Sequence, residues 1–291
     1  KYKIAVTKGN LNNHIGVPLS LLSIARTDEF AIIEMGANHQ GEIAELCKIA
    51  NPTHGLITNI GKAHLEGFGG VQGILKGKTE LFRHLENTNG KAFINLDDEK
   101  LAKNIPNTTV VSFSIGKKAD CIGHLESTHP HLIGSWVMGE KKGKIESSLY
   151  GSYNFSNILA ACCIANTFGV EEEKIEHAIN NYHSEMNRSQ LLVKGTNTIY
   201  LDAYNANPTS MSLSLKNFEQ VIAKNKVAIL GDMFELGKDA GKEHQAIIEL
   251  AEESTSISAF AFVGANFYTL KSLFNNYLFF KTTEEAKNWF S

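Results

Sequence analysis

The sequence has few cysteines, little net charge and no long apolar run, and each shortage argues against a class of protein. The four cysteines, which show neither a C-x-x-C pair nor zinc-site spacing, are Cys47, Cys121, Cys162 and Cys163. They predict free thiols in a reducing cytoplasm. The net charge of −3 argues against a nucleic-acid binder that depends on phosphate contacts. The longest strongly apolar run, residues 158–165, is far shorter than the ~20 residues needed to cross a bilayer, so we expect no membrane insertion.

The chain also lacks an initiator methionine and a phosphate-loop signature. It begins inside a strand-like run, residues 2–7, so we expect a cropped chain from which motifs have been cut away. The nearest match to a phosphate loop is GILKGKT at residues 73–79, which has three residues between its glycines where the signature has four. Because this segment also lies in a helical pattern, we do not assign it as a phosphate loop. The chain has no G-x-G-x-x-G either, so nothing indicates dinucleotide binding.

The chain does contain alternating strand and helix patterns. With 291 residues, 43% apolar and 20% charged, it has room for one large or two ordinary domains. The strands predicted in the first half, most of them separated by helices, lie at residues 2–7, 30–35, 54–60, 91–96 and 110–114. They predict a mostly parallel sheet with right-handed crossovers. A small antiparallel patch or set of hairpins is predicted over residues 119–150.

A second strand–helix series follows a boundary that we predict within residues 183–189. Its predicted strands lie at residues 199–203, 227–230 and 259–263. Its predicted helices lie at residues 209–222, 241–252, 266–274 and 283–290. We therefore expect two α/β domains, residues 1–186 and 187–291.

Residues 58–82 contain a histidine, His64, on a glycine-rich loop and a lysine fourteen residues later in an amphipathic helix. The apolar positions of this helix are 71, 74, 75, 81, 82 and 85. Helical spacing places Lys78 on the same inward face. A bare ammonium there is costly. Either another group neutralises or pairs Lys78, or its stem carries the charge out of the helix face.

Glu34 ends the apolar run at residues 30–35, which predicts a strand buried on both faces of a parallel sheet. Open α/β sheets place their ligands at the carboxyl ends of their strands. Glu34 is therefore either a ligand-facing acid or a carboxylate at a solvated strand end. The pattern alone favours neither interpretation.

Seven motifs resemble the Mur ligase family and follow that family's order. They are EMGANHQGEI, ITNIGKAHLEGFGG, KGKTELF, GSYNFSN, MNRSQ, DAYNANPTSM and LGDMFELG. Within the family, GNLNNHIGVP, DAYNANP and GDMFELG are similar to the MurF type. The resemblance implies a cytoplasmic, monomeric enzyme of peptidoglycan synthesis that uses ATP to join D-Ala-D-Ala to UDP-N-acetylmuramoyl-tripeptide.

The family has three domains, and the resemblance covers only part of that plan. It implies a partial P-loop-type central domain without its phosphate-loop start, followed by a Rossmann-like C-terminal domain that lacks its end. We therefore expect the isolated 291 residues to be inactive as a ligase. The alternatives are another Mur-type or folylpolyglutamate-synthetase-like ligase, or a non-catalytic nucleotide-binding module.

The resemblance implies a catalytic metal site with two Mg²⁺ ions. In the family, the lysine that matches Lys78 is carbamylated, which turns a cation into the anionic oxygen ligand that Mg²⁺ prefers. By the same resemblance, Glu34 holds the first Mg²⁺ and His64 contacts the second. These residues are expected to support a phosphoryl transfer that forms an acyl phosphate. Without the resemblance, the usual interpretation of His64 is a histidine on a surface loop.

The remaining site residues fall into two groups. Those that the resemblance places near ATP are Asn154, Asn157, Arg188, Asp202 and Asn205. Those expected to face the muramoyl peptide or D-Ala-D-Ala are Asn13, Asn38, His39 and Asp232. Several have a structural alternative, which is helix or strand-end capping for Asn154 and Asp232 and turn formation for the loop residues.

Overall fold

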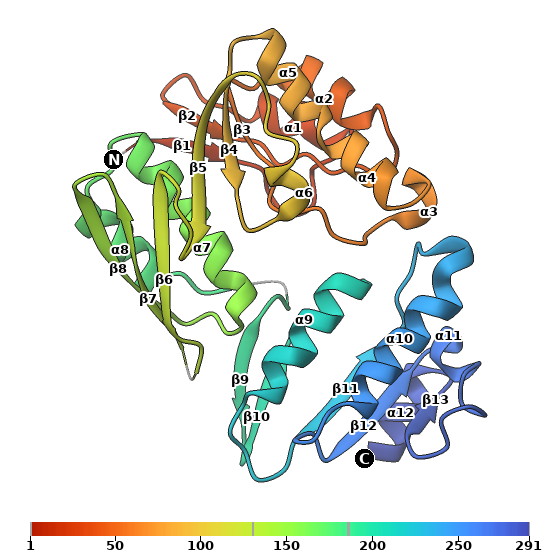
Figure 1. Cartoon of the computed structure of the whole chain (residues 1–291). Coiled ribbons are helices and arrows are strands. Elements are labelled where there is room, and N and C mark those ends of the chain that lie inside the picture. The colour runs from red at the N-terminus through yellow and green to blue at the C-terminus, as the bar shows by residue number, and fades with distance from the viewer. Residues whose placement is uncertain (1, 130, 185–186, 291) are drawn as a thin grey trace.

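The computed structural model describes residues 2–129, 131–184 and 187–290 as a mixed α/β protein (Figure 1). Its largest sheet has six strands in the order β3-β4-β5-β6-β7-β8. They are β3 His54–Leu56, β4 Lys91–Asn95, β5 Thr109–Ile115, β6 Cys121–Ser127, β7 Leu132–Met138 and β8 Lys141–Ser147. Strands β3 to β6 are parallel, and β6 to β8 are antiparallel. This confirms that the central sheet is mostly parallel, with three of the five predicted strands in it, and the antiparallel strands extend it instead of forming a separate patch.

Helices cover this sheet and the region beside it. The central helix α7 (Ser152–Thr167) packs against β4 to β7 around a core that includes Trp136 and Phe155. The other helices of the first half are α1 Gly16–Leu22, α2 Glu42–Ala50, α3 Leu65–Phe68, α4 Val71–Lys78, α5 Glu80–Asn87, α6 Glu99–Ala102 and α8 Glu172–Asn180. Within the described ranges, no helix combines the length and hydropathy that a membrane span requires.

The first two strands differ from the prediction. β1 (Ile4–Val6) and β2 (Phe30–Ile32) form a two-stranded parallel sheet of their own. The prediction that the second of them is buried on both faces is wrong, because Ile32 keeps 55% of its surface exposed. An apolar run favours a strand, but burial also requires neighbours. Among the described residues, β1 and β2 pair with no strand except each other.

The helix predicted over residues 71–85 is instead two helices, α4 and α5, which meet at Thr79. The Thr79 hydroxyl donates to the backbone oxygen of Leu75 at 2.8 Å. This kind of back-bonding competes with the regular helix pattern and bends helices. Lys78 is therefore the last residue of α4. The GILKGKT segment falls within this helical region and not in a strand-to-helix loop, as predicted.

Glycines allow α4 to pack closely on α3. A Cβ atom on Gly73 would lie 1.8 Å from the backbone oxygen of Phe68. A Cβ atom on Gly77 would lie 2.5 Å from the Phe68 ring. Only glycine fits at such an approach, so these two positions hold the Lys78 helix against the loop that carries His64.

Gly73→Ala is expected to destabilise the chain by about 1–3 kcal/mol, because the added methyl group must displace backbone atoms. The free energy of unfolding in urea measures this. The control is Gly241→Ala in helix α10 (Ala240–Glu252), where no heavy atom lies within 4 Å of the added Cβ. There the change should stabilise the protein by about 0.4–1 kcal/mol. Equal effects of the two substitutions would contradict the close-packing interpretation.

The second half begins with an antiparallel hairpin of β9 (Gln190–Lys194) and β10 (Asn197–Leu201). Strand β9 was not predicted, and β10, predicted at residues 199–203, lies outside the three-stranded parallel sheet. That sheet contains β11 Val227–Gly231, β12 Ala259–Val263 and β13 Leu278–Phe280. The helices are α9 Pro208–Glu219, α10, α11 Ala265–Tyr268 and α12 Thr283–Phe290, with a 3₁₀ turn at Gly237–Asp239.

In this half, one predicted helix is too long and one strand was not predicted. The helix predicted at residues 266–274 is only the one-turn α11. Strand β13 was missed because three residues are too few to show a strand period. It is instead specified by pairing with β12.

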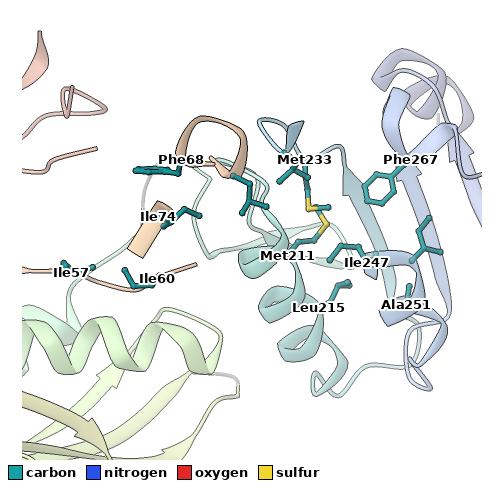
Figure 2. Packing of buried hydrophobic residues seen from close by; sticks show 14 of the residues in the cluster. Ile57, Ile60, Phe68, Ile74, Met211, Leu215, Met233, Ile247, Ala251 and Phe267 are labelled. Atoms are coloured by element: carbon teal, nitrogen blue, oxygen red, sulfur yellow. The ribbon is translucent and has the colours of Figure 1, made fainter. Parts of the chain in front are cut away.

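An apolar cluster joins the two halves. Phe68 of α3 and Ile74 of α4 belong to the same cluster as Met233 and as Met211 and Leu215 of α9, which lie across from them in the second half (Figure 2). Phe68, Ile74 and Met233 are each at most 2% exposed. The loop that carries His64 is therefore packed against the second half of the chain.

Candidate functional site

Lys78 lies half-buried at the end of α4, and its Nζ atom donates a hydrogen bond to the backbone oxygen of Asn59 at 3.0 Å. Burial lowers the pKa of Lys78 below its usual value. The Asp98 carboxylate opposes this shift, and Lys100 adds to it. Within the described residues, Lys78 forms no ion pair. Its amine is therefore more readily neutral, and so more nucleophilic, than an ordinary lysine.

The loop beside Lys78 is fixed by charged side chains. Asp98 accepts from the backbone nitrogen of Ile60 at 2.8 Å, and Lys100 donates to the backbone oxygen of Ile60 at 2.8 Å. Asp98 also accepts from two backbone nitrogens at the start of α6 and so caps that helix. The backbone that receives the Lys78 hydrogen bond is thus held in place.

His64 follows this loop with a left-handed backbone, φ +54°, immediately before α3. Its Nδ1 atom is hydrogen-bonded to the carboxylate of Glu235, which comes from the second half of the chain. Sequence reasoning missed Glu235. The two residues are 171 positions apart, and no periodic signal links positions so distant.

Glu34 is exposed and lies just beyond β2. One carboxylate oxygen accepts from Asn12 Nδ2 at 2.9 Å, and the Glu34 backbone nitrogen donates to Thr7 Oγ1 at 2.9 Å. A Cβ atom on Gly36 would lie 2.8 Å from Asn12 Nδ2, so this glycine leaves room for Asn12. The Glu34 carboxylate is therefore contacted by Asn12, a residue that the sequence analysis did not single out.

Asn13 and the loop after Glu34 have structural roles. The Asn13 side chain accepts from two backbone nitrogens at the start of α1, as a turn former does. Glu42 accepts from the backbone nitrogens of Asn38 and His39, and also pairs with His39 Nδ1 at 3.1 Å. Glu80 of α5 accepts from two backbone nitrogens at the start of α2. The carboxylates of Glu42 and Glu80 thus hold the loop that carries Asn38 and His39.

In the part of the chain that the structure describes, no group of three or more His, Cys, Asp or Glu side chains is arranged to hold a metal ion. Glu34 and His64 therefore do not form part of a closed cage of such ligands. Mg²⁺ rarely needs one, because it commonly uses one or two protein carboxylates together with water and substrate phosphates. The donor set of Glu34 and a modified Lys78 fits that sparse kind of site.

The residues assigned to ATP gather where the two halves of the chain meet. Asn154 is buried in α7, and its Nδ2 donates to Tyr150 O at 2.8 Å and to Ser189 Oγ at 2.9 Å. It donates from inside the helix, so it does not act as the cap that we considered. The Tyr153 hydroxyl is hydrogen-bonded to both Ser189 and Asp202 at 3.0 Å. Tyr153 and Ser189 are site neighbours that sequence reasoning missed.

The other ATP candidates lie around this network. The Arg188 guanidinium stacks on the Tyr204 ring, 3.8 Å from its centroid. Asn157 is exposed one turn after Asn154, and the two side chains approach to 3.5 Å. Asn205 is exposed. The structure therefore brings together Asn154, Asp202 and Arg188 near the junction and leaves the ATP role of each a prediction.

The Tyr153–Asp202 hydrogen bond is expected to couple the two halves by about 1 kcal/mol. Burial raises the pKa of Tyr153, so its hydroxyl keeps the proton that it donates to Asp202. A double-mutant cycle of Tyr153→Phe and Asp202→Asn, followed by urea unfolding, measures the coupling. Ser212→Ala in α9 serves as a control for an unrelated lost hydroxyl. If the two substitutions change the free energy of unfolding additively, the hydrogen bond does not couple the two halves.

Asp232 has a structural role that its motif did not reveal. Its carboxylate accepts from the backbone nitrogens of Asn266 and Phe267 at 2.8 and 3.0 Å, at the start of α11. His244 Nε2, which accepts from the backbone nitrogen of Met233, lies 3.5 Å from the same carboxylate. Asp232 therefore caps a helix, whereas the alternative that we considered for it was strand-end capping. Its contact with D-Ala-D-Ala remains a prediction.

Known proteins match the whole of this arrangement. The family model described as Mur ligase middle domain matches residues 1–165, and the model described as Mur ligase, glutamate ligase domain matches residues 187–283. The UDP-N-acetylmuramoyl-tripeptide–D-alanyl-D-alanine ligase of Buchnera aphidicola subsp. Acyrthosiphon pisum is 34% identical over 98% of this chain and 64% of its own length. The chain thus spans slightly less than two thirds of that relative.

Solved structures of Mur ligases have the same fold as this chain. MurF from Acinetobacter baumannii has a TM-score of 0.90 at 30% identity, covering 99% of this chain and 64% of that one. MurF from Thermotoga maritima, solved in complex with ADP, shares the fold with a TM-score of 0.81 at 24% identity, covering 97% of this chain and 70% of that one. Because the middle-domain model alone covers more than half of the sequence, the chain belongs to the Mur ligase family.

Proposed function

We propose that this chain is the catalytic body of an ATP-dependent ligase that adds D-Ala-D-Ala to UDP-N-acetylmuramoyl-tripeptide. The main support for this proposal is the environment of the Lys78 amine. The side chain is half-buried, its pKa is lowered, and its Nζ atom donates a hydrogen bond to the neutral backbone carbonyl of Asn59. That environment does little to stabilise the positive charge of an unmodified lysine. The similarity to the UDP-N-acetylmuramoyl-tripeptide–D-alanyl-D-alanine ligase of Buchnera supports the choice of substrates.

In the proposed reaction, a carboxylate oxygen of the tripeptide attacks the γ-phosphorus of ATP, and ADP leaves. The amine of D-Ala-D-Ala then attacks the acyl carbon, phosphate leaves with the carboxylate oxygen, and the amide loses a proton. Asn154, Asn157, Arg188, Asp202 and Asn205 are assigned to ATP. Asn13, Asn38, His39 and Asp232 are assigned to the two peptide substrates. We further infer that the enzyme is cytoplasmic and monomeric and takes no nucleic acid.

The proposal includes a carbamate on Lys78. The neutral amine adds to the carbon of CO₂ and loses a proton, which leaves an anionic group with two oxygen atoms. That group and Glu34 are the oxygen donors that would hold Mg²⁺, with His64 near the second ion. When bound, Mg²⁺ supplies positive charge that stabilises the transferring phosphoryl group.

The carbamate is directly measurable on the 291-residue chain. With ¹³C-labelled bicarbonate, one carbamate carbon signal is expected in the NMR spectrum, and it should grow as the pH rises because deprotonation makes the amine nucleophilic. A lowered pKa moves this growth to lower pH than for an ordinary lysine. Lys78→Met should remove the signal, and Lys76→Met should leave it unchanged. A signal that survives in Lys78→Met would contradict the assignment.

Phosphate release tests the ligase function. The longest chain that the gene encodes is incubated with ATP, Mg²⁺, UDP-N-acetylmuramoyl-tripeptide and D-Ala-D-Ala. Phosphate release that requires both peptide substrates is the expected result, and release that ignores either of them would contradict the function. The 291 residues alone are expected to release none, because the sequence has no phosphate-loop signature.

A further inference from the structure

A side chain from the second half of the chain, Glu235, contacts the predicted metal ligand His64. The segment from Gly61 to Phe68 is held from that side. The backbone nitrogen of Lys62 donates to Thr209 Oγ1 at 2.9 Å, and Lys62 Nζ pairs with the largely buried Glu243 at 2.7 Å. The backbone nitrogen of Glu66 donates to the backbone oxygen of Glu235 at 3.3 Å.

The contact between His64 and Glu235 differs from the others because it involves an imidazole. An ionised carboxylate only accepts hydrogen bonds, so His64 Nδ1 must carry the proton. In the neutral ring the lone pair is then on Nε2. This is the arrangement in which a histidine binds a metal ion, with a carboxylate behind it that fixes the tautomer and the ring orientation.

We propose that Glu235 is a positioning residue that holds His64 in the Nδ1–H tautomer and directs Nε2 towards the predicted metal site. Glu235 belongs to the second half of the chain, and Lys78, Glu34 and His64 belong to the first. The histidine is therefore oriented only while the two halves are closed on each other. Only one part of this inference rests on the proposed function, namely that His64 faces a metal site.

The geometry supports a specific role over general packing. The Glu235 side chain is 56% exposed and the His64 side chain 31% exposed, so neither is a core residue whose loss unfolds the protein. Glu235 also has a left-handed backbone, φ +60°, a conformation that is uncommon for a residue other than glycine. The nearby apolar contacts, Met233 and Leu236, remain when the carboxylate is removed.

The test uses the ¹⁵N-labelled 291-residue chain and reads the imidazole tautomer from long-range ¹H–¹⁵N NMR. The chain has 11 histidines, and the signals lost in His64→Gln identify the one of interest. In Glu235→Ala, His64 is expected to lose its Nδ1–H preference. Glu235→Gln, which keeps an oxygen acceptor, should retain it. The matched control is Glu243→Gln, which removes the ion pair with Lys62 but leaves the His64 contact in place.

Mn²⁺ affinity, measured by electron paramagnetic resonance, gives a second readout. Glu235→Ala is expected to weaken Mn²⁺ binding by about 10- to 100-fold, and Glu235→Gln by much less. An unchanged tautomer or unchanged Mn²⁺ affinity in Glu235→Ala would overturn the proposal. So would an equal tautomer change in Glu243→Gln, because closure alone would then orient the ring. The tautomer readout needs neither substrate nor turnover, so it stands apart from a failure of the ligase assay.

Discussion

Replacing Lys78 with methionine is expected to lower the ligase rate of the complete gene product by about 10²- to 10³-fold, the usual cost of removing one preorganised electrostatic group. Methionine keeps the length of the stem but can neither react with CO₂ nor donate to Asn59 O. The fold should persist, because replacing a partly buried charge by an apolar side chain is often neutral. Initial rates of phosphate release at saturating substrates measure the loss.

The matched control for this loss is Lys76→Met, two residues earlier on the same helix. Lys76 is exposed, so its substitution should change the rate less than about twofold. Comparable losses in both variants would mean that α4 tolerates no substitution, and the special role of Lys78 would be lost. A fully active Lys78→Met enzyme would contradict the carbamate directly.

Glu34→Gln is expected to lower the ligase rate by about 10²-fold at ordinary Mg²⁺ concentration, which is the second large effect that we predict. The amide keeps the shape and the hydrogen bond from Asn12 but removes the negative charge that favours a divalent cation. The loss should therefore shrink as Mg²⁺ is raised, because higher concentration compensates for weaker binding. Rates over a Mg²⁺ titration measure both features.

Glu45→Gln provides the control for Glu34, because this acid is exposed on α2. It should leave both the rate and the Mg²⁺ dependence as they are. If the Glu34→Gln rate loss is the same at every Mg²⁺ concentration, the carboxylate does not act through the metal. Glu34 would then be the solvated strand-end acid that the sequence pattern equally allowed.

Local patterns in the sequence predicted local structure well. Helices α2 and α10 have apolar residues at helical spacing along one face, and Asp98 caps α6 soon after strand β4. These features depend on neighbours a few residues away. The sequence therefore contains the whole of their physical cause.

Contacts between distant segments were not predictable in the same way. Glu235 at His64, Glu243 at Lys62, and Ser189 at Asn154 each join residues that no repeat or spacing connects. The prediction that β2 is buried was wrong for a related reason. An apolar strand pattern does not indicate which elements lie beside the strand. Motif resemblance supplied the candidates, and only the folded chain shows what positions them.

An isotope experiment tests the acyl-phosphate reaction most directly. The complete gene product is given tripeptide substrate with ¹⁸O in the reacting carboxylate, together with ATP and D-Ala-D-Ala, and the released nucleotide and phosphate are analysed by mass spectrometry. We predict one ¹⁸O atom in each released phosphate, because the attacking carboxylate oxygen leaves with it. Label in AMP, or unlabelled phosphate with amide product, would contradict this reaction.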